Sequence, residues 1–589
     1  MKALIFNSGI GSRMGRLTEN CPKCLLKLEN NESIFARQLR ILYECGITEV
    51  IVTTGKYDHE LMEESRTQPG MDVIFVNNPL YASTNYIYSM YLAGKYLDDD
   101  ILMLHGDLVF DKELVAGILS DSRPSLCLIN RHMSQPPKDF KGRIVNGDLR
   151  EVSVNIFDDN CYGLQPLYKL SRECVQSWLD EAGKLVKQGI TDVYAENALN
   201  NIAHRLHIKE MSYEGYYINE IDTPEDYERV SREISMVDKG TYFGIYALKM
   251  LVKKYGVKRP FAIMGRHVKG SFADDFLGTP DVATGRYFGV VENPNEESVR
   301  DAQQAFEEFG GDCLISIGGG SAIDTAKAVK YNLSGQPQYS GLIHIAVPTT
   351  AGSGSEATRF SVICRHGAKC SIDDPSLLPE HAVLDSRLLY SLGEQQRKVS
   401  LLDALCHSVE SLMSRHSTNK SREYALYAMK TILEKYKDFA VGDLSVYDEI
   451  LGASHYAGRA IDISKTTVGH ALSYTLTSDY QIQHGQAVGM CLIYVLRYAE
   501  GRQHYRAELE PLYRAMECKE GEGIADRLLA VYRDLSPEHP FDLSNADPDM
   551  LVKKVNADRL GNSVLAFDKK DLREIYADII ASPEWIRSK

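Results

Sequence analysis

Two glycine-containing loops, one in each half of this chain, have the composition of phosphate-binding turns. The first, Asn7–Gly15 (NSGIGSRMG), follows the short apolar segment Ala3–Phe6. The second, Gly318–Ser321 (GGGS), follows the apolar segment Leu314–Ile317. Glycines let the backbone approach a phosphate closely, and the N–H groups exposed in such turns bind anions. A glycine after a strand is also a common tight turn. The residues around each loop must therefore decide whether the chain has two active sites.

Charged residues in the first half have the types that phosphoryl transfer needs. Lys23 follows the loop, Asp107 follows the apolar segment Ile101–Leu104, and Asp222 stands in IDTPEDY. When phosphate groups react, anions are brought together, and Lys, Arg and a divalent cation offset their repulsion. Carboxylate oxygens suit Mg²⁺. Asp222 can also cap the helix that Thr-Pro-Glu-Asp begins, a role compatible with metal binding.

Alternating strands and helices must position these residues. Ile34–Cys45 has the pattern of an amphipathic helix, and Val50–Thr53 and Val73–Val76 have that of strands. Strands and helices that alternate at this length predict a mainly parallel α/β sheet. Asp107 then lies at the carboxyl end of a strand, where ligands bind in such sheets.

The second half contains residues suited to a metal and a dinucleotide. Asp403 and His407 are four residues apart and therefore share one face of a helix, and His470 and His484 follow. One Asp and three His suit a divalent transition metal, although histidines on helices are usually core or surface residues. Thr349–Ser355 (TTAGSGS) is a second small-residue loop. Neither loop of this half has the GxGxxG fingerprint of a standard Rossmann domain.

The first half resembles the sugar-phosphate nucleotidyltransferases and, within them, the small cytidylyltransferases that act on phosphocholine or phosphonates. The resemblance rests on GIGSRM, PKCLLKL, NPLYASTNYIYSMYLA, HGD and IDTPEDY, which together span this half. It implies a Rossmann-like mixed sheet, CTP as the nucleotide and Mg²⁺ as the cation. It also implies a triphosphate cradle, catalytic groups and Mg²⁺ ligands: Gly9, Gly11, Ser12, Arg13 and Lys23 for the nucleotide, Arg13, Lys23, Asp107 and Asp222 for catalysis, and Asp107 and Asp222 for Mg²⁺.

The acceptor substrate of this half is less constrained by the sequence. Many relatives have two alanines, next to the nucleotide base, where this chain has Asn7 and Ser8. This difference bears on whether cytosine is the base that the site selects. Asn85, Tyr86 and Glu196 are the polar and aromatic candidates for substrate contacts. Each of them can equally have a structural role, and a glutamate is more often solvated than functional.

The second half resembles the iron-dependent (group III) alcohol dehydrogenases. GGGSAIDTAK, PTTAGSGSE, the Asp403/His407 pair, GHALSY and HGQAVGM occur in the order of that family. The resemblance implies an α/β dinucleotide-binding domain followed by an all-α metal-binding domain, NAD(P)H as the hydride donor, and Fe²⁺ as the metal. Zn²⁺ would bind such ligands at least as well. The implied metal ligands are Asp403, His407, His470 and His484; the implied cofactor contacts are Gly318, Gly319, Ser321, Thr349, Thr350, Ser353 and Lys369.

One departure from the family bears on the aldehyde substrate. Many members have a further histidine four residues after the third ligand, where this chain has Tyr474, and the HALSY form resembles the branch that reduces phosphonoacetaldehyde. A small charged substrate needs cations in the cleft, for which Arg359 and Lys465 are the candidates; the alternative is that both are solvated or ion-paired. Gly265-Arg266-His267, without an acid for the ribose, favours NADPH.

Composition excludes several other classes of protein. The 589 residues exceed a single core, and the net charge of −15 argues against nucleic-acid and anionic-membrane partners. No run approaches the apolar length of a membrane helix, and the apolar run between Met1-Lys2 and Ser8 is too short for a signal-peptide core. We expect a cytoplasmic homo-oligomer with three domains, at residues 1–235, 236–378 and 379–589. Helical spacing of Ile245, Leu248, Val252 and Tyr255 predicts a packed helix, not a loose linker, after the first domain.

Together the two halves predict a bifunctional enzyme acting on small anions with a phosphorus head. The second half would reduce phosphonoacetaldehyde to 2-hydroxyethylphosphonate, and the first would join that phosphonate to CMP from CTP, giving an activated donor for decorating a glycan or lipid. The alternative keeps both chemistries but reduces a sugar phosphate and forms a CDP-polyol. A scaffold with one inactive half is disfavoured, because every expected metal ligand and loop glycine is present.

Overall fold

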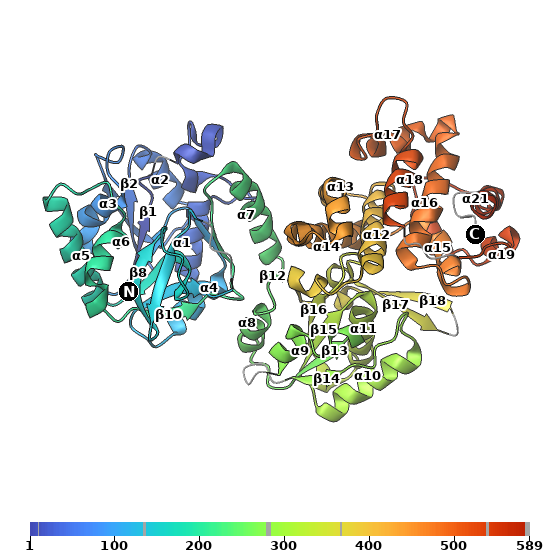
Figure 1. The fold of residues 1–589 in the computed structure, drawn as a ribbon, viewed down its shortest axis with the longest axis horizontal. Coiled ribbons are helices and arrows are strands. Elements are labelled where there is room, and N and C mark those ends of the chain that lie inside the picture. The colour runs from blue at the N-terminus through green and yellow to red at the C-terminus, as the bar shows by residue number, and fades with distance from the viewer. Residues whose placement is uncertain (10, 133–136, 279–283, 366–367, 537–540, 583–589) are drawn as a thin grey trace. The chain divides into compact units, whose positions relative to one another are not determined.

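The computed structural model describes residues 1–9, 11–132, 137–278, 284–365, 368–536 and 541–582. The chain divides into two compact units, Met1–Tyr242 and Phe243–Lys589 (Figure 1). Among the described residues, no helix combines the length and the apolar composition needed to cross a membrane.

The first unit is built on a nine-stranded mixed sheet in the order β3-β2-β1-β4-β9-β6-β10-β8-β7. β1 (Lys2–Phe6) pairs in parallel with β2 (Glu49–Thr54) and β4 (Ile101–His105), while β9 (Cys161–Leu170) is antiparallel to β4. The mixed sheet that the resemblance implied is thereby confirmed. The mainly parallel sheet predicted from the alternation of strands and helices holds for β3-β2-β1-β4 but not for the whole sheet, because β9, β8 and β7 pair antiparallel with their neighbours. The remaining strands are β3 (Asp72–Asn77), β6 (Leu126–Asn130), β7 (Lys141–Val145), β8 (Asp148–Ser153) and β10 (Lys209–Ser212).

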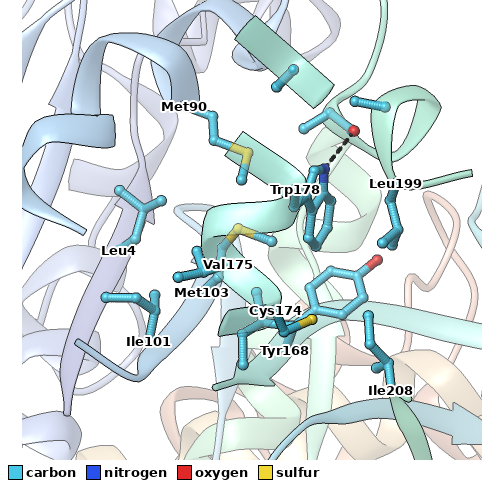
Figure 2. Packing of buried hydrophobic residues seen from close by; sticks show 14 of the residues in the cluster. Leu4, Met90, Ile101, Met103, Tyr168, Cys174, Val175, Trp178, Leu199 and Ile208 are labelled. Atoms are coloured by element: carbon cyan, nitrogen blue, oxygen red, sulfur yellow. Dashed lines mark hydrogen bonds between the residues drawn. The ribbon is translucent and has the colours of Figure 1, made fainter. Parts of the chain in front are cut away.

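Both faces of this sheet are buried, because successive side chains of a strand point to opposite faces. Leu4 of β1 lies in one apolar cluster, with residues of α3 (Tyr86–Ala93), α5 (Arg172–Lys187) and α6 (Ala195–Ile202). Ile5 lies in the other cluster, with residues of α1 (Ile34–Glu44) and α4 (Lys112–Ser120). Figure 2 shows the first cluster around Trp178, whose indole N–H donates to the Ala195 carbonyl at 2.8 Å.

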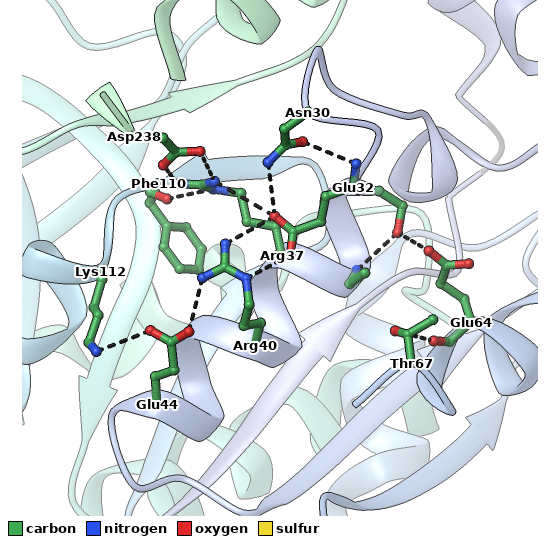
Figure 3. Close-up of polar contacts among 12 residues, drawn as sticks. Asn30, Glu32, Arg37, Arg40, Glu44, Glu64, Thr67, Phe110, Lys112 and Asp238 are labelled. Carbon is green, nitrogen blue, oxygen red and sulfur yellow. Dashed lines mark hydrogen bonds and ion pairs between the residues drawn. The ribbon is translucent and has the colours of Figure 1, made fainter. Parts of the chain in front are cut away.

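Helix α7 (Pro224–Val237) closes the first unit. Thr223, not Asp222, is its N-cap, and Asp226 completes a capping box. Asp222 is therefore free to contribute its carboxylate to a site. After the helix, Asp238 accepts two hydrogen bonds from the buried Arg37 guanidinium of α1, at 2.8 and 2.9 Å, and Arg37 also donates to the Phe110 carbonyl (Figure 3). These bonds fix the end of α7 on the sheet unit.

The helix predicted after the first domain is present as α8 (Ala247–Lys254), which follows β12 (Thr241–Phe243). Ile245, Leu248 and Val252 are buried, as their spacing predicted. Tyr255 is the exception: it lies just beyond the helix with 41% of its surface exposed, and its hydroxyl is 2.7 Å from Nε2 of His381.

The second unit begins with a six-stranded sheet in the order β12-β19-β16-β15-β13-β14. The pairings β14–β13–β15–β16–β19 are parallel, as expected for a dinucleotide-binding domain. Its strands and main helices are β13 (Pro260–Met264), β14 (Gly285–Tyr287), β15 (Cys313–Gly318), β16 (Ile343–Pro348), β19 (His381–Leu384), α9 (Phe272–Leu277), α10 (Glu296–Phe309) and α11 (Gly320–Leu333). A hairpin of β17 (Phe360–Arg365) and β18 (Ala368–Asp373) precedes β19.

From Glu394 onward, the described elements of this unit are helical. The helical part begins later than the predicted residue 379, because β19 lies within the predicted range and pairs with β16 of the sheet. Helix α12 (Glu394–Leu412) is buried on all sides from Val399 to Leu412, so its polar side chains must find partners inside the helical domain. The other helices are α13 (Asn419–Val441), α14 (Tyr447–Ser464), α15 (Val468–Asp479), α16 (His484–Glu500), α17 (Arg506–Ala515), α18 (Ile524–Leu535), α19 (Pro548–Lys553), α20 (Ala557–Gly561) and α21 (Lys569–Ala581).

Candidate active sites

The glycine loop after β1 opens on a pocket of about 510 Å³ in the first unit. Gly11 has φ 68°, a left-handed conformation that favours glycine, and it precedes the short helical turn Ser12–Thr18. Three of the five predicted nucleotide contacts, Gly9, Gly11 and Ser12, line this pocket, whereas Arg13 and Lys23 do not. Its other lining residues include Ser8, Asn85, Tyr86, His105 and Asp107.

All four predicted catalytic residues of this unit meet in one ionic cluster. The Lys23 ammonium lies 2.5 Å from Asp107 and 3.2 Å from Asp222, and the Arg13 guanidinium lies 3.0 Å from the other oxygen of Asp222. Burial opposes the charge on Lys23, but attraction to the two carboxylates outweighs it, and the pKa of Lys23 is raised. The cluster therefore holds a permanent cation beside the pocket, where triphosphate charge would accumulate.

The same cluster has oxygen donors suited to Mg²⁺. The buried Oδ1 of Asp107 has no hydrogen-bond partner, and ligand atoms of His105, Asp107 and Glu220 lie within 4.8 Å of one another. Glu220 ends the short strand β11 (Ile218–Glu220); burial and the neighbouring Asp107 and Asp222 raise its pKa well above the ordinary value. A bound cation would relieve this repulsion, so the donor set fits a hard divalent ion. Sequence reasoning missed Glu220, although it stands two residues before Asp222.

Of the three predicted acceptor-substrate residues, Asn85 and Tyr86 line the pocket and Glu196 does not. Asn85 lines the pocket and also caps α3, accepting a hydrogen bond from the Tyr86 N–H at 2.8 Å. Glu196 is 1% exposed and does not line the pocket. It accepts hydrogen bonds from the hydroxyls of Tyr86 and Tyr168, so it can act on the pocket only by orienting Tyr86.

The four predicted metal ligands of the second unit come together from three helices. Asp403 and His407 lie one turn apart on α12, His470 lies in the first turn of α15, and His484 is the first residue of α16. Oδ1 of Asp403 is 3.8, 3.6 and 4.0 Å from Nε2 of the three histidines in chain order. The rings of His407 and His470 stack at 4.8 Å between centroids.

These residues fit a divalent transition metal. Oδ1 of Asp403 and Nε2 of His470 are buried and have no hydrogen-bond partner, although they face each other across 3.6 Å. Burial lowers the pKa of His484 and of His407, which keeps both imidazoles neutral, the form that binds metals. The donor set of one carboxylate and three imidazoles suits Fe²⁺ or Zn²⁺.

A buried glutamate that sequence reasoning missed holds the third ligand. Glu410 lies on α12 and is 0% exposed; it accepts a hydrogen bond from Nδ1 of His470, from the His470 N–H at 3.1 Å and from the Thr467 hydroxyl at 2.9 Å. Burial disfavours a charged His470, but the negative charges of Glu410 and Asp403 outweigh it and raise its pKa to about 9. The carboxylates thus stabilise positive charge here, whether a proton or a metal ion carries it. The only indication of this role in the sequence was the position of Glu410, one helical turn beyond His407.

A cleft of about 900 Å³ runs from this ligand set to the glycine loop after β15. A Cβ on Gly320 would lie 3.0 Å from the Ser353 hydroxyl, so the two small-residue loops pack against each other only because glycine is present. The predicted cofactor contacts that line the cleft are Gly319, Ser321, Thr350, Ser353 and Lys369. Gly318 and Thr349 lie behind them, joined by a hydrogen bond of 3.0 Å between the Thr349 N–H and the Gly318 carbonyl.

The cleft fits a dinucleotide. The N-terminus of α11, a helix of fourteen residues, begins at its glycine loop and would place a positive dipole end at a pyrophosphate. After β13, Arg266 and His267 line the cleft, and His267 lies 2.9 Å from the Thr349 hydroxyl. The choice between NADH and NADPH stays a prediction from the residues of this segment.

The two predicted substrate cations do not line the cleft. Arg359 and Lys465 both pair with Asp373 of β18, at 2.9 and 2.7 Å. The structure therefore shows the ion-paired alternative for both side chains, because they share the carboxylate of Asp373. At the metal end, the cations that line the cleft are Lys369 and Arg559 instead.

Comparison with known families covers both units. The model "Iron-containing alcohol dehydrogenase" matches residues 241–386, and "Fe-containing alcohol dehydrogenase family, C-terminal" matches residues 399–576. The model "MobA-like NTP transferase domain" matches residues 3–198.

Curated relatives match part of the chain. A phosphonoacetaldehyde reductase of Streptomyces viridochromogenes is 32% identical over 225 residues, which cover 34% of this chain and 57% of the relative. A sulfoacetaldehyde reductase of Bilophila wadsworthia is 30% identical over 213 residues, covering 34% of this chain and 55% of the relative. The chain thus spans little more than half the length of these two relatives.

Solved structures agree with the fold of the second unit. An iron-containing alcohol dehydrogenase from Thermotoga maritima is 27% identical, with a TM-score of 0.52, and the match covers 58% of this chain and 98% of that one. A sulfoacetaldehyde reductase from Bifidobacterium kashiwanohense in complex with NAD⁺ is 23% identical, with a TM-score of 0.53, over 58% of this chain and 97% of that one. At the latter identity the likeness concerns the fold alone.

Proposed function

Because this chain joins an N-terminal MobA-like NTP transferase domain to C-terminal iron-containing alcohol dehydrogenase domains, we propose that it catalyses two consecutive reactions. The second unit reduces phosphonoacetaldehyde to 2-hydroxyethylphosphonate. The first unit transfers CMP from CTP to that phosphonate and releases pyrophosphate. The product is an activated phosphonate suited to the decoration of a glycan or lipid.

The observation that carries the reductase half is the ligand set Asp403, His407, His470 and His484, which lines a cleft together with a glycine loop. A divalent metal bound there, Fe²⁺ or Zn²⁺, supplies Lewis-acid polarisation of the aldehyde oxygen, and bound NAD(P)H supplies the hydride. Glu410 holds Nδ1 of His470 and so directs Nε2 toward Asp403. Ser353 and Thr350 pack against the glycine loop and define the phosphate end of the cofactor site.

The transferase half is supported by the cluster of Lys23, Arg13, Asp107 and Asp222. The Lys23 ammonium lies between two carboxylates beside the pocket, where it can neutralise a phosphate that displaces one of them. Arg13 follows the glycine loop and can reach the same phosphates. Mg²⁺ held by Asp107 with Asp222 or Glu220 supplies the remaining positive charge.

The substrates named for two of the relatives favour a phosphonate as the substrate of this chain. Phosphonoacetaldehyde and sulfoacetaldehyde are both two-carbon aldehydes with an anionic head group, and reductases of both are similar to this chain. The reduced phosphonate retains its head group, which is the nucleophile that a nucleotidyltransferase needs. The two proposed reactions therefore share one compound, the alcohol that the second unit makes and the first consumes.

The test combines both reactions with purified protein. The protein is incubated with NADH or NADPH, phosphonoacetaldehyde, CTP and Mg²⁺, while nicotinamide absorbance and pyrophosphate release are followed. We expect oxidation of the nicotinamide first and pyrophosphate release once the alcohol has formed. Turnover with a sugar phosphate but not with the phosphonoaldehyde would instead support CDP-polyol formation and refute the proposal.

Two variants separate the sites. Asp107→Ala should abolish pyrophosphate release, because it removes the carboxylate that contacts Lys23 in the first unit. It should leave aldehyde reduction unchanged, because the metal ligands and the cofactor cleft belong to the second unit. His470→Ala should abolish hydride transfer and leave pyrophosphate release from added 2-hydroxyethylphosphonate unchanged. Loss of both activities from either change would contradict two separable sites.

A further inference from the structure

Arg559 differs from most arginines of this protein in having no carboxylate partner among the described residues. Arg37, Arg40, Arg123, Arg143 and Arg387 each form ion pairs with acidic side chains. The guanidinium of Arg559 donates to the hydroxyl of Thr466 and is also hydrogen-bonded to the hydroxyl of Tyr474, and both of these groups are neutral. A half-buried cation without a counter-ion is costly in a protein unless a ligand supplies the charge.

The surroundings of Arg559 place its guanidinium at the metal end of the cleft. Arg559, Thr466 and Tyr474 all line the cleft. Thr466 stands four residues before His470, and its carbonyl accepts a hydrogen bond from Asn562 at 3.1 Å, which fixes the turn beside α20. The Arg559 guanidinium lies 5.2 Å from the centre of the Tyr474 ring, and that ring lies 6.2 Å from the His484 ring.

Tyr474 connects the cation to the metal ligands. Its ring contacts Arg559 on the side of α20 and lies near Lys369 of β18, whose ammonium is 5.8 Å from the ring centre. The ring and the hydrogen bond to its hydroxyl together limit the rotation of the guanidinium. A guanidinium has five N–H donors, so those that Thr466 and Tyr474 leave free are held ready for an anion in the cleft.

We propose that Arg559, supported by Thr466 and Tyr474, binds the anionic group of the aldehyde substrate and determines the specificity of the reductase site. The proposal deepens the function given above and rests on it. A guanidinium matches the oxygens of a phosphonate, sulfonate or carboxylate with paired hydrogen bonds. With the carbonyl oxygen at the four metal ligands and the anion at Arg559, the reacting carbon lies between them. Only aldehydes with a short spacer between carbonyl and anion would fit both ends.

Lys369 does not take the same role in this proposal. It projects from the hairpin of the dinucleotide-binding domain, and burial lowers its pKa. Its position is consistent with the nicotinamide side of the cleft, as the sequence resemblance implied. Arg559 comes from the helical domain and contacts the turn that leads into His470. Substitutions of the two residues should therefore differ in effect: a change at Arg559 should weaken aldehyde binding, and a change at Lys369 should weaken cofactor binding.

The experiment compares Arg559→Ala and Arg559→Lys with the wild type on phosphonoacetaldehyde, sulfoacetaldehyde and uncharged propionaldehyde. Arg359→Ala is the matched control, because that arginine pairs with Asp373 and does not line the cleft. For Arg559→Ala we expect KM for both anionic aldehydes to rise about 100-fold, the loss typical of a hydrogen bond to a charged group. KM for propionaldehyde and the Kd for NAD(P)H should stay within about threefold, as should every constant of Arg359→Ala.

A binding measurement accompanies the kinetics. The inhibition constant of 2-hydroxyethylphosphonate as a product inhibitor of aldehyde reduction, which reports the reductase site alone, should rise in Arg559→Ala by a factor similar to the change in KM, and Arg559→Lys should retain part of the affinity because the charge remains. Metal content and Tm, measured for each variant, show whether the fold is intact.

The outcomes separate this inference from the proposed function. A wild type that does not prefer anionic aldehydes overturns the proposed substrate before any variant is considered. A wild type that prefers them, with unchanged KM in Arg559→Ala, overturns the role of Arg559 alone. An equal loss on all three aldehydes also overturns it, since a residue that only supports the fold does not discriminate between charged and uncharged substrates.

Discussion

Replacing Glu410 by glutamine tests how the metal site is held together. In the protein, Oε1 of Glu410 accepts hydrogen bonds from the Thr467 N–H, the Thr467 hydroxyl and the His470 N–H, at 3.2, 2.9 and 3.1 Å. Oε2 accepts from Nδ1 of His470. Three donors would keep the amide oxygen of glutamine at the Oε1 position, so its NH₂ group would face Nδ1 of His470.

The consequence is a change of tautomer at a metal ligand. Facing an NH₂ donor, Nδ1 of His470 must accept, which places the ring proton on Nε2, the atom that lies 3.6 Å from Asp403. A protonated Nε2 cannot bind a metal. Loss of an outer carboxylate of this kind typically costs about 10- to 100-fold in metal affinity, which corresponds to about 1.4–2.8 kcal/mol. Metal-free Glu410→Gln should also lose about 1–3 kcal/mol of unfolding free energy, because a buried charged hydrogen bond is removed.

The assay is metal affinity by competition with a chelator, with metal content of the purified protein as a second readout. Glu356→Gln is the control: Glu356 is equally buried and lies 3.2 Å from Nδ1 of His455, which is not one of the metal ligands. The control should lose stability but keep its metal affinity. Wild-type affinity in Glu410→Gln would refute the tautomer argument, and equal losses in both variants would show that the effect is a general loss of stability.

Two further predictions concern the second unit. Gly318→Ala places a Cβ 2.5 Å from that of Ala322, so the start of α11 must shift; we expect a loss of about 1–3 kcal/mol in unfolding free energy and weaker NAD(P)H binding, measured by denaturant unfolding and by nicotinamide fluorescence. In metal-free protein, the folded-state pKa of His470 of about 9 lies above its unfolded value, so the stabilising contribution of His470 is present at pH 6 and is lost as the pH rises through 9. Over that interval, the Tm of chelated wild type should fall more than the Tm of chelated Glu410→Gln. Parallel curves for the two proteins would contradict the assignment of this pH dependence to the pair His470–Glu410.

Local sequence patterns were sufficient for the parts of the sites that depend on backbone geometry. Asp403 and His407 share a face because an α-helix brings residues four apart together, and the glycine loops follow strands because the turns need small residues. The packed helix α8 could be predicted from the spacing of Ile245, Leu248 and Val252, since burial of one face requires that period. Tyr255, one turn further, continues the pattern but lies beyond the end of the helix and stays exposed.

Other parts were decided only when distant segments packed together. Glu220, Glu410 and Arg559 carry no local signal that distinguishes them from other charged residues, yet each lies beside a predicted site residue. Arg359 and Lys465 stand close in sequence to the cofactor loop and to a metal ligand, but both pair with Asp373 and neither lines the cleft. The sequence alone therefore determined which chemistry the protein contains, because short-range spacing follows from the geometry of helices and turns. Only the tertiary structure decided which charges remain unpaired at the site, because a charge is compensated by whichever group packing brings within a few ångströms.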